Sequence, residues 1–179
     1  MSIPTIETER LRLRAFAERD LEPYAAMYAD ERFARFLEGR TLSRAQAWEN
    51  IALILGHWAL RGYGIWAVER QGSGELVGRA GLLNLPGWPD VEICWALSPA
   101  HWGSGYATEA SRAAIDWAFG ETDLRRLISL IHPDNEASRA VALRLGEQFR
   151  EQITFEGKPT DVYEVLAGSA GGSPAAGKR

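Results

Sequence analysis

The chain has 179 residues, of which 46% are hydrophobic and 25% charged, as expected of one globular domain with its own core. Acidic residues outnumber basic ones 24 to 20, a formal net charge of -4 that argues against a nucleic-acid partner. The single cysteine, Cys94, excludes an intramolecular disulfide and a multi-cysteine metal site. Residues 51–60, the longest apolar run, are too few for a membrane span, and with no signal peptide expected we predict a cytoplasmic protein.

Hydrophobic periodicity predicts alternating strands and helices along the chain. Apolar and basic residues alternate over 10–16, which is typical of a half-buried strand. Asp20 is a suitable N-cap for a helix over 20–29, and Ser43 with Gln46 three residues later predicts a second helix that ends at Gly62. Further strands are predicted at 64–70, 76–83, 91–97, 126–131, 149–155 and 161–165, and further helices at 106–117 and 135–145.

This order of elements predicts one mixed α/β domain over residues 5–167. The consecutive strands in the middle of the chain are expected to pair antiparallel. Segment 168–179 consists largely of glycine and other small residues, so we expect a disordered tail there.

The most informative stretch is the Gly-rich turn between the strand over 91–97 and the following helix. Gly103 and Gly105 flank Ser104 immediately before that helix. Glycines allow several backbone N–H groups to converge, and the helix N-terminus adds unpaired donors, so the turn suits a diphosphate. The patterns GxxxxGK(S/T) and GxGxxG are both missing, which excludes the common nucleotide-binding loops. A GxG turn is by itself as often ordinary loop structure as a ligand site.

Four segments in chain order resemble the GNAT superfamily of acetyl-CoA-dependent N-acetyltransferases, and in particular its RimJ/RimL-like branch. They are ETERLRLR at 7–14, GIWAVE with LVGRAGL at 64–82, WGSGYATEA at 102–110 and HPDNEASRAVALRLG at 132–146. The resemblance covers essentially the whole folded chain. It implies a GNAT fold, with a mixed, mostly antiparallel sheet of about seven strands and four helices. It also implies that the fourth and fifth strands splay apart.

The resemblance implies acetyl-CoA as co-substrate and no metal. Backbone N–H groups of the Gly-rich turn would hold the pyrophosphate, and the end of the fourth strand would pair with the pantetheine arm. A backbone N–H near Trp95 would polarise the thioester carbonyl. The cofactor-binding residues implied are Trp95, Ala96, Leu97, Trp102, Gly103, Ser104, Gly105, Tyr106, Ala107, Thr108, Asn135 and Arg139.

Acetyl transfer by direct attack in a ternary complex needs a neutral amine and a proton for the leaving thiolate. Glu92, on the fourth strand, is our candidate base, although it could instead be a solvent-facing strand residue. Ser138 is our candidate acid, although its hydroxyl could serve only the start of a helix. The tyrosine that many relatives use as acid is replaced here by Ala142, and Tyr163 and Tyr106 are the alternatives.

The acceptor is the least determined part. The resemblance implies a groove built by the first two helices, the loop after the third strand and the last hairpin, which Phe33, Trp58 and Trp88 would line. Acidic residues that could attract an amine there are Glu31, Glu38, Glu49 and Asp90. Protein N-termini, amino acids, polyamines and aminoglycosides stay open as acceptors, and so do a monomer and a homodimer. The alternative function is a non-catalytic CoA-binding sensor or partner module.

Overall fold

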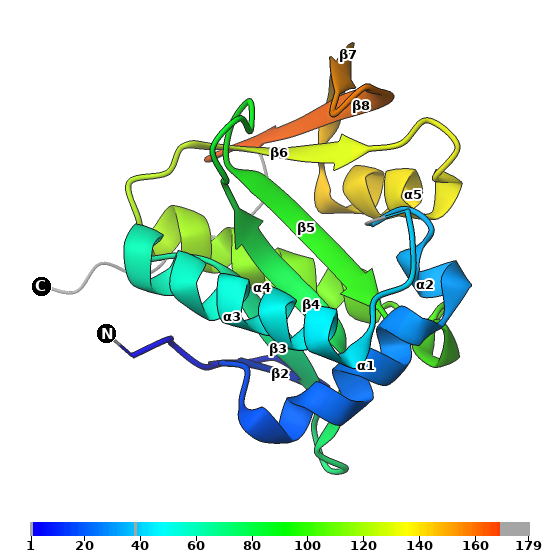
Figure 1. Cartoon of the computed structure of the whole chain (residues 1–179). Coiled ribbons are helices and arrows are strands. Elements are labelled where there is room, and N and C mark those ends of the chain that lie inside the picture. Colours follow the sequence, from blue (N-terminus) through cyan, green and yellow to red (C-terminus); the bar gives the residue numbers. More distant parts are fainter. Residues whose placement is uncertain (1, 38, 169–179) are drawn as a thin grey trace, which may run out of the picture.

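The computed structural model describes residues 2–37 and 39–168. These residues form one sheet in the strand order β1-β2-β3-β4-β5-β6-β8-β7, with α1 and α3 on one face and α4 on the other (Figure 1). The strands are β1 (Ile6–Glu7), β2 (Leu11–Arg14), β3 (Ile65–Arg70), β4 (Glu75–Leu83), β5 (Glu92–Leu97), β6 (Arg126–Ile131), β7 (Gln148–Phe155) and β8 (Lys158–Leu166). The α-helices are α1 (Leu21–Ala29), α2 (Glu31–Ala34), α3 (Arg44–Arg61), α4 (Tyr106–Glu121) and α5 (Glu136–Leu145).

The mixed α/β class and the mostly antiparallel sheet are confirmed, with small corrections to the counts. The described sheet has eight strands where about seven are expected, because β1 is too short to show an alternating pattern. The fifth helix is α2, a single turn that Asp30 caps by accepting a hydrogen bond from the backbone N–H of Arg32. The expected tail lies almost wholly outside the described residues, which end at Gly168.

Local sequence signals set the ends of α3 as expected. The Ser43 side chain accepts a hydrogen bond from the Gln46 N–H, and the Gln46 side chain accepts one from the Ser43 N–H at 2.9 Å. At the other end Gly62 takes φ = 77°, a conformation that glycine adopts without strain. The helix therefore lies in a fixed register against the sheet.

The parallel pair β5–β6 is joined at one register position only, Glu92 opposite Ile128. Figure 1 shows the two strands diverging beyond this point. Because the short β1 was not expected, β5 and β6 are the fourth and fifth strands of the sequence prediction, and their expected splay is confirmed. The Ser129 hydroxyl donates to the Ile93 carbonyl oxygen at 3.0 Å and bridges the strands just past the last paired residues. The remainder of the β5 edge that faces β6 is left without a strand partner.

A buried ion pair, rather than a helix cap, accounts for Asp20. The Asp20 carboxylate accepts two hydrogen bonds from the Arg14 guanidinium, at 2.7 and 2.8 Å, and Arg14 also donates to Glu69 at 2.7 Å. The three side chains are at most 10% exposed. Asp20 occupies the N-cap position of α1 as predicted, but its side chain makes no capping hydrogen bond to that helix, because the carboxylate compensates a buried guanidinium and ties β2 and β3 to the start of α1.

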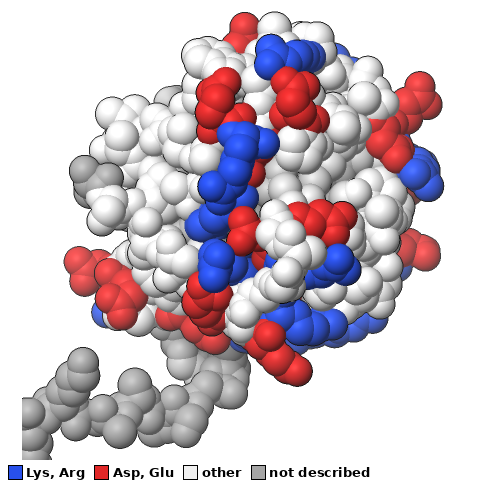
Figure 2. Space-filling model, turned by 90° about the horizontal axis from the view of Figure 1, so that it is seen from below, with Lys and Arg blue, Asp and Glu red and all other residues white. Residues whose placement is uncertain are grey.

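Charges on the surface are interleaved. On the face seen in Figure 2, basic side chains are bordered by acidic ones. Exposed ion pairs between neighbouring strands include Arg12 with Glu7 at 2.6 Å, on β2 and β1, and Arg70 with Glu75 at 3.3 Å, on β3 and β4. That face therefore presents no continuous basic surface of the kind that a phosphate backbone would require.

We predict that Asp20→Ala lowers the free energy of unfolding by about 3–5 kcal/mol, because it leaves the buried Arg14 charge incompletely compensated. Urea unfolding measures the change. The control is Glu22→Ala, which breaks an exposed pair with Arg44 at 2.6 Å and should cost less than about 1 kcal/mol. Equal losses in the two variants would contradict a structural role for the buried pair.

Candidate active site

Glu92 lies where β5 and β6 begin to separate. It is the first residue of β5 and stands opposite Ile128, the last point at which the two strands pair. Its carboxylate accepts a hydrogen bond from the indole N–H of Trp88 at 2.8 Å. Trp88 is in turn held edge-to-face against Phe155 of β7, with ring centroids 5.0 Å apart. The carboxylate is thus fixed in place by a strand, a loop and the last hairpin.

Burial raises the pKa of Glu92 to about 7. The hydrogen bond from Trp88, the positive charge of Arg79 and the backbone N–H of Leu130 oppose this rise, whereas the charge of Glu156 adds to it. A carboxyl group that titrates near neutrality can both accept and release a proton under physiological conditions.

A cavity of about 550 Å³, which we call the central cavity, opens in front of Glu92. Its walls come from the α2–α3 connection, α3, β4, β5, β6 and the β7–β8 hairpin. The lining residues that matter below are Arg35, Arg40, Glu49, Arg79, Leu83, Leu85, Trp88, Glu92, Phe155, Glu156 and Lys158. A volume of this size suits a small organic ligand.

Two of the three aromatic residues expected in the acceptor groove lie in the core instead. Trp58 is 2% exposed, donates its indole N–H to the Ile65 carbonyl oxygen at 2.9 Å and packs against Trp66. Phe33 is 5% exposed and packs edge-to-face on Tyr28. Their placement in the groove is wrong, because both project into the apolar interior. Trp88 does line the central cavity.

The acidic residues expected around the acceptor are dispersed. Glu49 lines the central cavity, and Glu31 lines a neighbouring hollow. Asp90 instead forms an ion pair with Arg126 at 2.7 Å. Glu38 lies outside the described residues.

The Gly-rich turn leads directly into α4 with both glycines in the left-handed region. Gly103 has φ = 76° and Gly105 has φ = 81°. Helix α4 begins at Tyr106, and the Glu109 N–H donates to the Gly105 carbonyl oxygen, so the N–H groups of the preceding turn have no acceptor within the helix. Trp102 fixes the start of the turn through its indole N–H, which donates to the Leu97 carbonyl oxygen at 2.7 Å. The result is an exposed cluster of donors at a helix N-terminus.

Two residues of the connection between β1 and β2 also hold this turn in place, which sequence reasoning missed. The Arg10 guanidinium donates to the Ser104 carbonyl oxygen at 2.9 Å, forms an ion pair with Glu109 at 2.6 Å and lies over the Tyr106 ring. The Thr8 hydroxyl also donates to Glu109, at 2.6 Å. These contacts turn the Ser104 carbonyl toward Arg10. Arg10 was part of the alternating pattern over 10–16, but its partners lie 94 to 99 positions away in the sequence, where no local pattern can indicate them.

Asn135, Ser138 and Arg139 lie together at the start of α5. The Asn135 side chain caps the helix by accepting a hydrogen bond from the Ser138 N–H at 3.1 Å. The Arg139 guanidinium lies 3.7 Å from Glu136. None of the three lines the central cavity with Glu92. The acid role of Ser138 and the cofactor contacts of Asn135 and Arg139 stay predictions.

A second buried carboxyl group, Glu147, follows the glycine that ends α5. It is 2% exposed, and neither of its oxygens has a hydrogen-bond partner among the described residues. Burial raises its pKa to about 7; the Glu92 charge adds to the rise, whereas the Arg112 charge opposes it. The sequence gives no sign of this burial, because Glu147 begins a polar run before β7.

Residues 2–37 and 39–168 form a part of the chain in which no three His, Cys, Asp or Glu side chains are grouped so as to hold a metal ion. None of its helices is long and apolar enough to cross a membrane.

Comparison with known proteins shows one consistent likeness. Residues 10–148 match the model of the Acetyltransferase (GNAT) domain. The uncharacterized N-acetyltransferase YoaA of Bacillus subtilis (strain 168) is 29% identical, over 91% of this chain and 97% of its own. The solved acetyltransferase from Agrobacterium tumefaciens str. C58 has a TM-score of 0.84 at 33% identity, covering 92% of this chain and 95% of its own.

A more distant structure has the same fold. RimL, a ribosomal L7/L12 alpha-N-protein acetyltransferase solved in complex with coenzyme A, has a TM-score of 0.77. It is 20% identical, and the match covers 91% of this chain and 98% of that one. At this identity the likeness concerns the fold alone.

We predict that Glu147→Gln stabilises the protein at pH 8 by about 2–3 kcal/mol and has little effect at pH 4. The folded-state pKa of Glu147 is raised to about 7 from 4.5. Between these two values the unfolded chain has lost the proton that the folded chain keeps, so the wild type loses stability as pH rises through that window. Urea unfolding at several pH values measures this. The control is Glu151→Gln, at an exposed position of β7, and a pH-independent effect of Glu147→Gln would contradict the prediction.

Proposed function

The chain belongs to the GNAT family of acetyltransferases, and from this premise we propose that it transfers the acetyl group of acetyl-CoA to a primary amine of a small molecule or peptide. The observation that carries the proposal is Glu92, a carboxyl group whose pKa is about 7, at the point where β5 and β6 separate inside the central cavity. From this position a base can take the proton of a nucleophile that attacks a group lying between β5 and β6.

The residues present fit acetyl-CoA. The donors at the start of α4 suit a pyrophosphate, because they combine unpaired N–H groups with the positive end of the helix dipole. The open edge of β5, at Trp95, Ala96 and Leu97, can accept an extended arm as an added strand. A fold shared with RimL, which was solved with coenzyme A, supports the same assignment. Acetyl-CoA supplies an acetyl group activated as a thioester.

The proposed mechanism is direct attack within a ternary complex. Glu92 removes the proton of the bound amine, whose nitrogen forms the new bond to the acetyl carbon while the carbon–sulfur bond breaks. A backbone N–H near Trp95 stabilises the charge that develops on the acetyl oxygen. Ser138 is the proposed donor of the proton that the leaving thiolate takes up, with Tyr163 of β8 as the alternative.

We predict that Glu92→Gln lowers kcat by about 10²- to 10⁴-fold and leaves the KM for acetyl-CoA unchanged. Because the deprotonated carboxylate is the active form, wild-type activity should be lost as pH falls below about 7, the pKa of Glu92. The variant, tested with the same amine, should lack this step. Thiol release from acetyl-CoA over a panel of amines measures both effects.

The matched control is Glu49→Gln, which removes another carboxylate from the wall of the same cavity. It should leave the pH profile unchanged. Equal loss of kcat in both variants, or an unchanged kcat in Glu92→Gln, would remove Glu92 from the role of base. Protection by CoA without turnover of any amine would favour a non-catalytic binding module.

We predict that CoA raises the melting temperature and that Gly105→Val abolishes this shift. Valine at φ = 81° is strained and adds bulk where the pyrophosphate would lie. The control is Gly72→Val, which has the same φ of 81° in the turn between β3 and β4. It should lose similar stability and keep the CoA shift. A persistent shift in Gly105→Val would show that the Gly-rich turn does not bind the cofactor.

A further inference from the structure

Three cations, which we call the cationic rim, line the central cavity together with Glu92: Arg35 after α2, Arg40 in the α2–α3 connection, and Lys158 at the start of β8. The Lys158 ammonium lies 3.3 Å from where a Cβ on Gly39 would stand, so the two walls meet there. Among the described residues, no carboxylate lies within 4.0 Å of these three cations.

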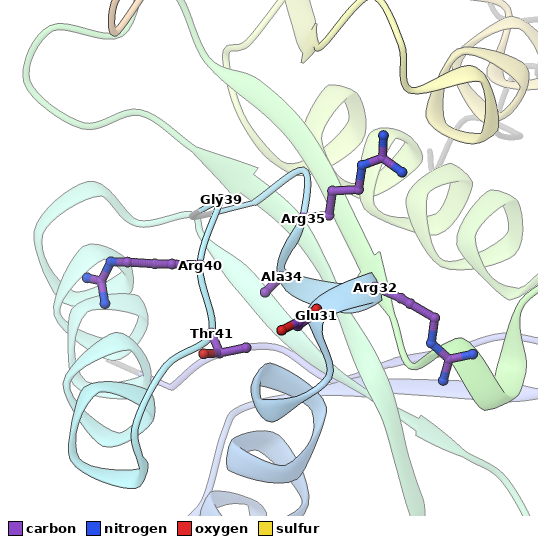
Figure 3. Close-up of a pocket in the computed structure, with 7 residues that line it drawn as sticks. All are labelled: Glu31, Arg32, Ala34, Arg35, Gly39, Arg40 and Thr41. Atoms are coloured by element: carbon purple, nitrogen blue, oxygen red, sulfur yellow. The ribbon is translucent and has the colours of Figure 1, made fainter.

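Figure 3 shows Arg35 and Arg40 extending in different directions from the α2–α3 connection. A hollow of about 530 Å³ lies at this connection and shares both arginines with the central cavity. Arg32 is also on α2, but its side chain is held by Asp30 at 2.6 Å and it does not line the central cavity. Arg35, in contrast to Arg32, has an aromatic ring and not a carboxylate beside it, since its guanidinium lies 4.7 Å from the centroid of the Phe36 ring.

The central cavity is lined by more cations than carboxyl groups, although the chain as a whole is acidic. Its lining includes four cations, Arg35, Arg40, Arg79 and Lys158, against three carboxyl groups, Glu49, Glu92 and Glu156. The chain as a whole carries a net charge of -4. Apolar side chains, including those of Leu83, Leu85 and Phe155, complete the lining.

We propose that the acceptor is a small amine that carries an anionic group, a carboxylate or a phosphate, at the end remote from its amine. The inference rests on the proposed function, since it places the amine beside Glu92. The rim cations then bind the anionic group through charge-assisted hydrogen bonds. Glu156, whose charge acts on Glu92, favours the ammonium end of the same molecule. A diamine would place its second positive charge against the rim, which disfavours it as an acceptor.

The test is a series of aminoalkanoates of increasing chain length, with aminoalkyl phosphates, aminoalkanoic amides and diamines of matched length. We expect kcat/KM for the anionic amines to exceed that for the amides by at least about tenfold, with diamines lower still. The two anionic series distinguish a carboxylate from a phosphate. Amides or diamines that react as well as the acids would overturn the inference and leave the proposed function standing.

Variants of the rim add a second readout. Lys158→Met and Arg40→Gln should raise the KM for the best anionic amine about tenfold, with kcat and the constants for the matched amide unchanged. Lys158→Glu should shift the preference toward diamines, which a merely structural role would not do. Arg32→Gln, outside the central cavity, is the control and should change none of these constants. Equal effects on acid and amide would overturn the inference.

Binding separates the two proposals if turnover fails. Melting temperatures with CoA present report whether an aminoalkanoate protects the protein more than its amide does. Absence of thiol release with every amine overturns the proposed function. Greater protection by the acid in that case supports the anion site, and equal protection by acid and amide overturns it.

Discussion

The architecture of the site depends on one constraint, the restriction of β5–β6 pairing to Glu92 and Ile128. A fully paired neighbour would cover the edge of β5 and leave no opening in the sheet. Because the ladder stops after one position, the Ser129 hydroxyl bridges to the Ile93 carbonyl oxygen and the strands separate beyond it. The same separation places the Glu92 carboxylate in the wall of the central cavity and leaves the rest of the β5 edge without a strand partner on that side.

Two carboxyl groups near this separation, the half-buried Glu92 and the buried Glu147, differ in whether a ligand can reach them. Glu92 and Glu147 both have pKa values raised to about 7 by burial, and the charge of Glu92 raises the pKa of Glu147 further. Glu92 lines the central cavity, where it has a hydrogen bond from Trp88. Glu147 is buried in the protein interior, and neither of its carboxyl oxygens has a hydrogen-bond partner among the described residues. Catalytic sites commonly retain such unfavourable burial, but only the first group has access to a ligand.

Local signals in the sequence predicted most of the fold, because they act over a few residues. The Ser43–Gln46 capping box set α3, and the glycine pattern set the turn before α4. The splay of β5 and β6 came from the family resemblance, since no periodicity reveals how far two strands pair. Phe33 and Trp58 were misplaced because a helical pattern does not say what each face meets. Glu147 was missed because its burial depends on how α4, α5 and β6 pack.

The contacts of Thr8 and Arg10 with Glu109 and Ser104 join residues between 94 and 101 positions apart in the sequence. Closing so long a loop is slow compared with forming α4 itself, because chain entropy must be overcome before the contacts form. The shape of the turn at the start of α4 depends on the segment between β1 and β2 as well as on the residues of the turn. A substitution at Thr8 or Arg10 would act on the Gly-rich turn from a position far outside it in the sequence.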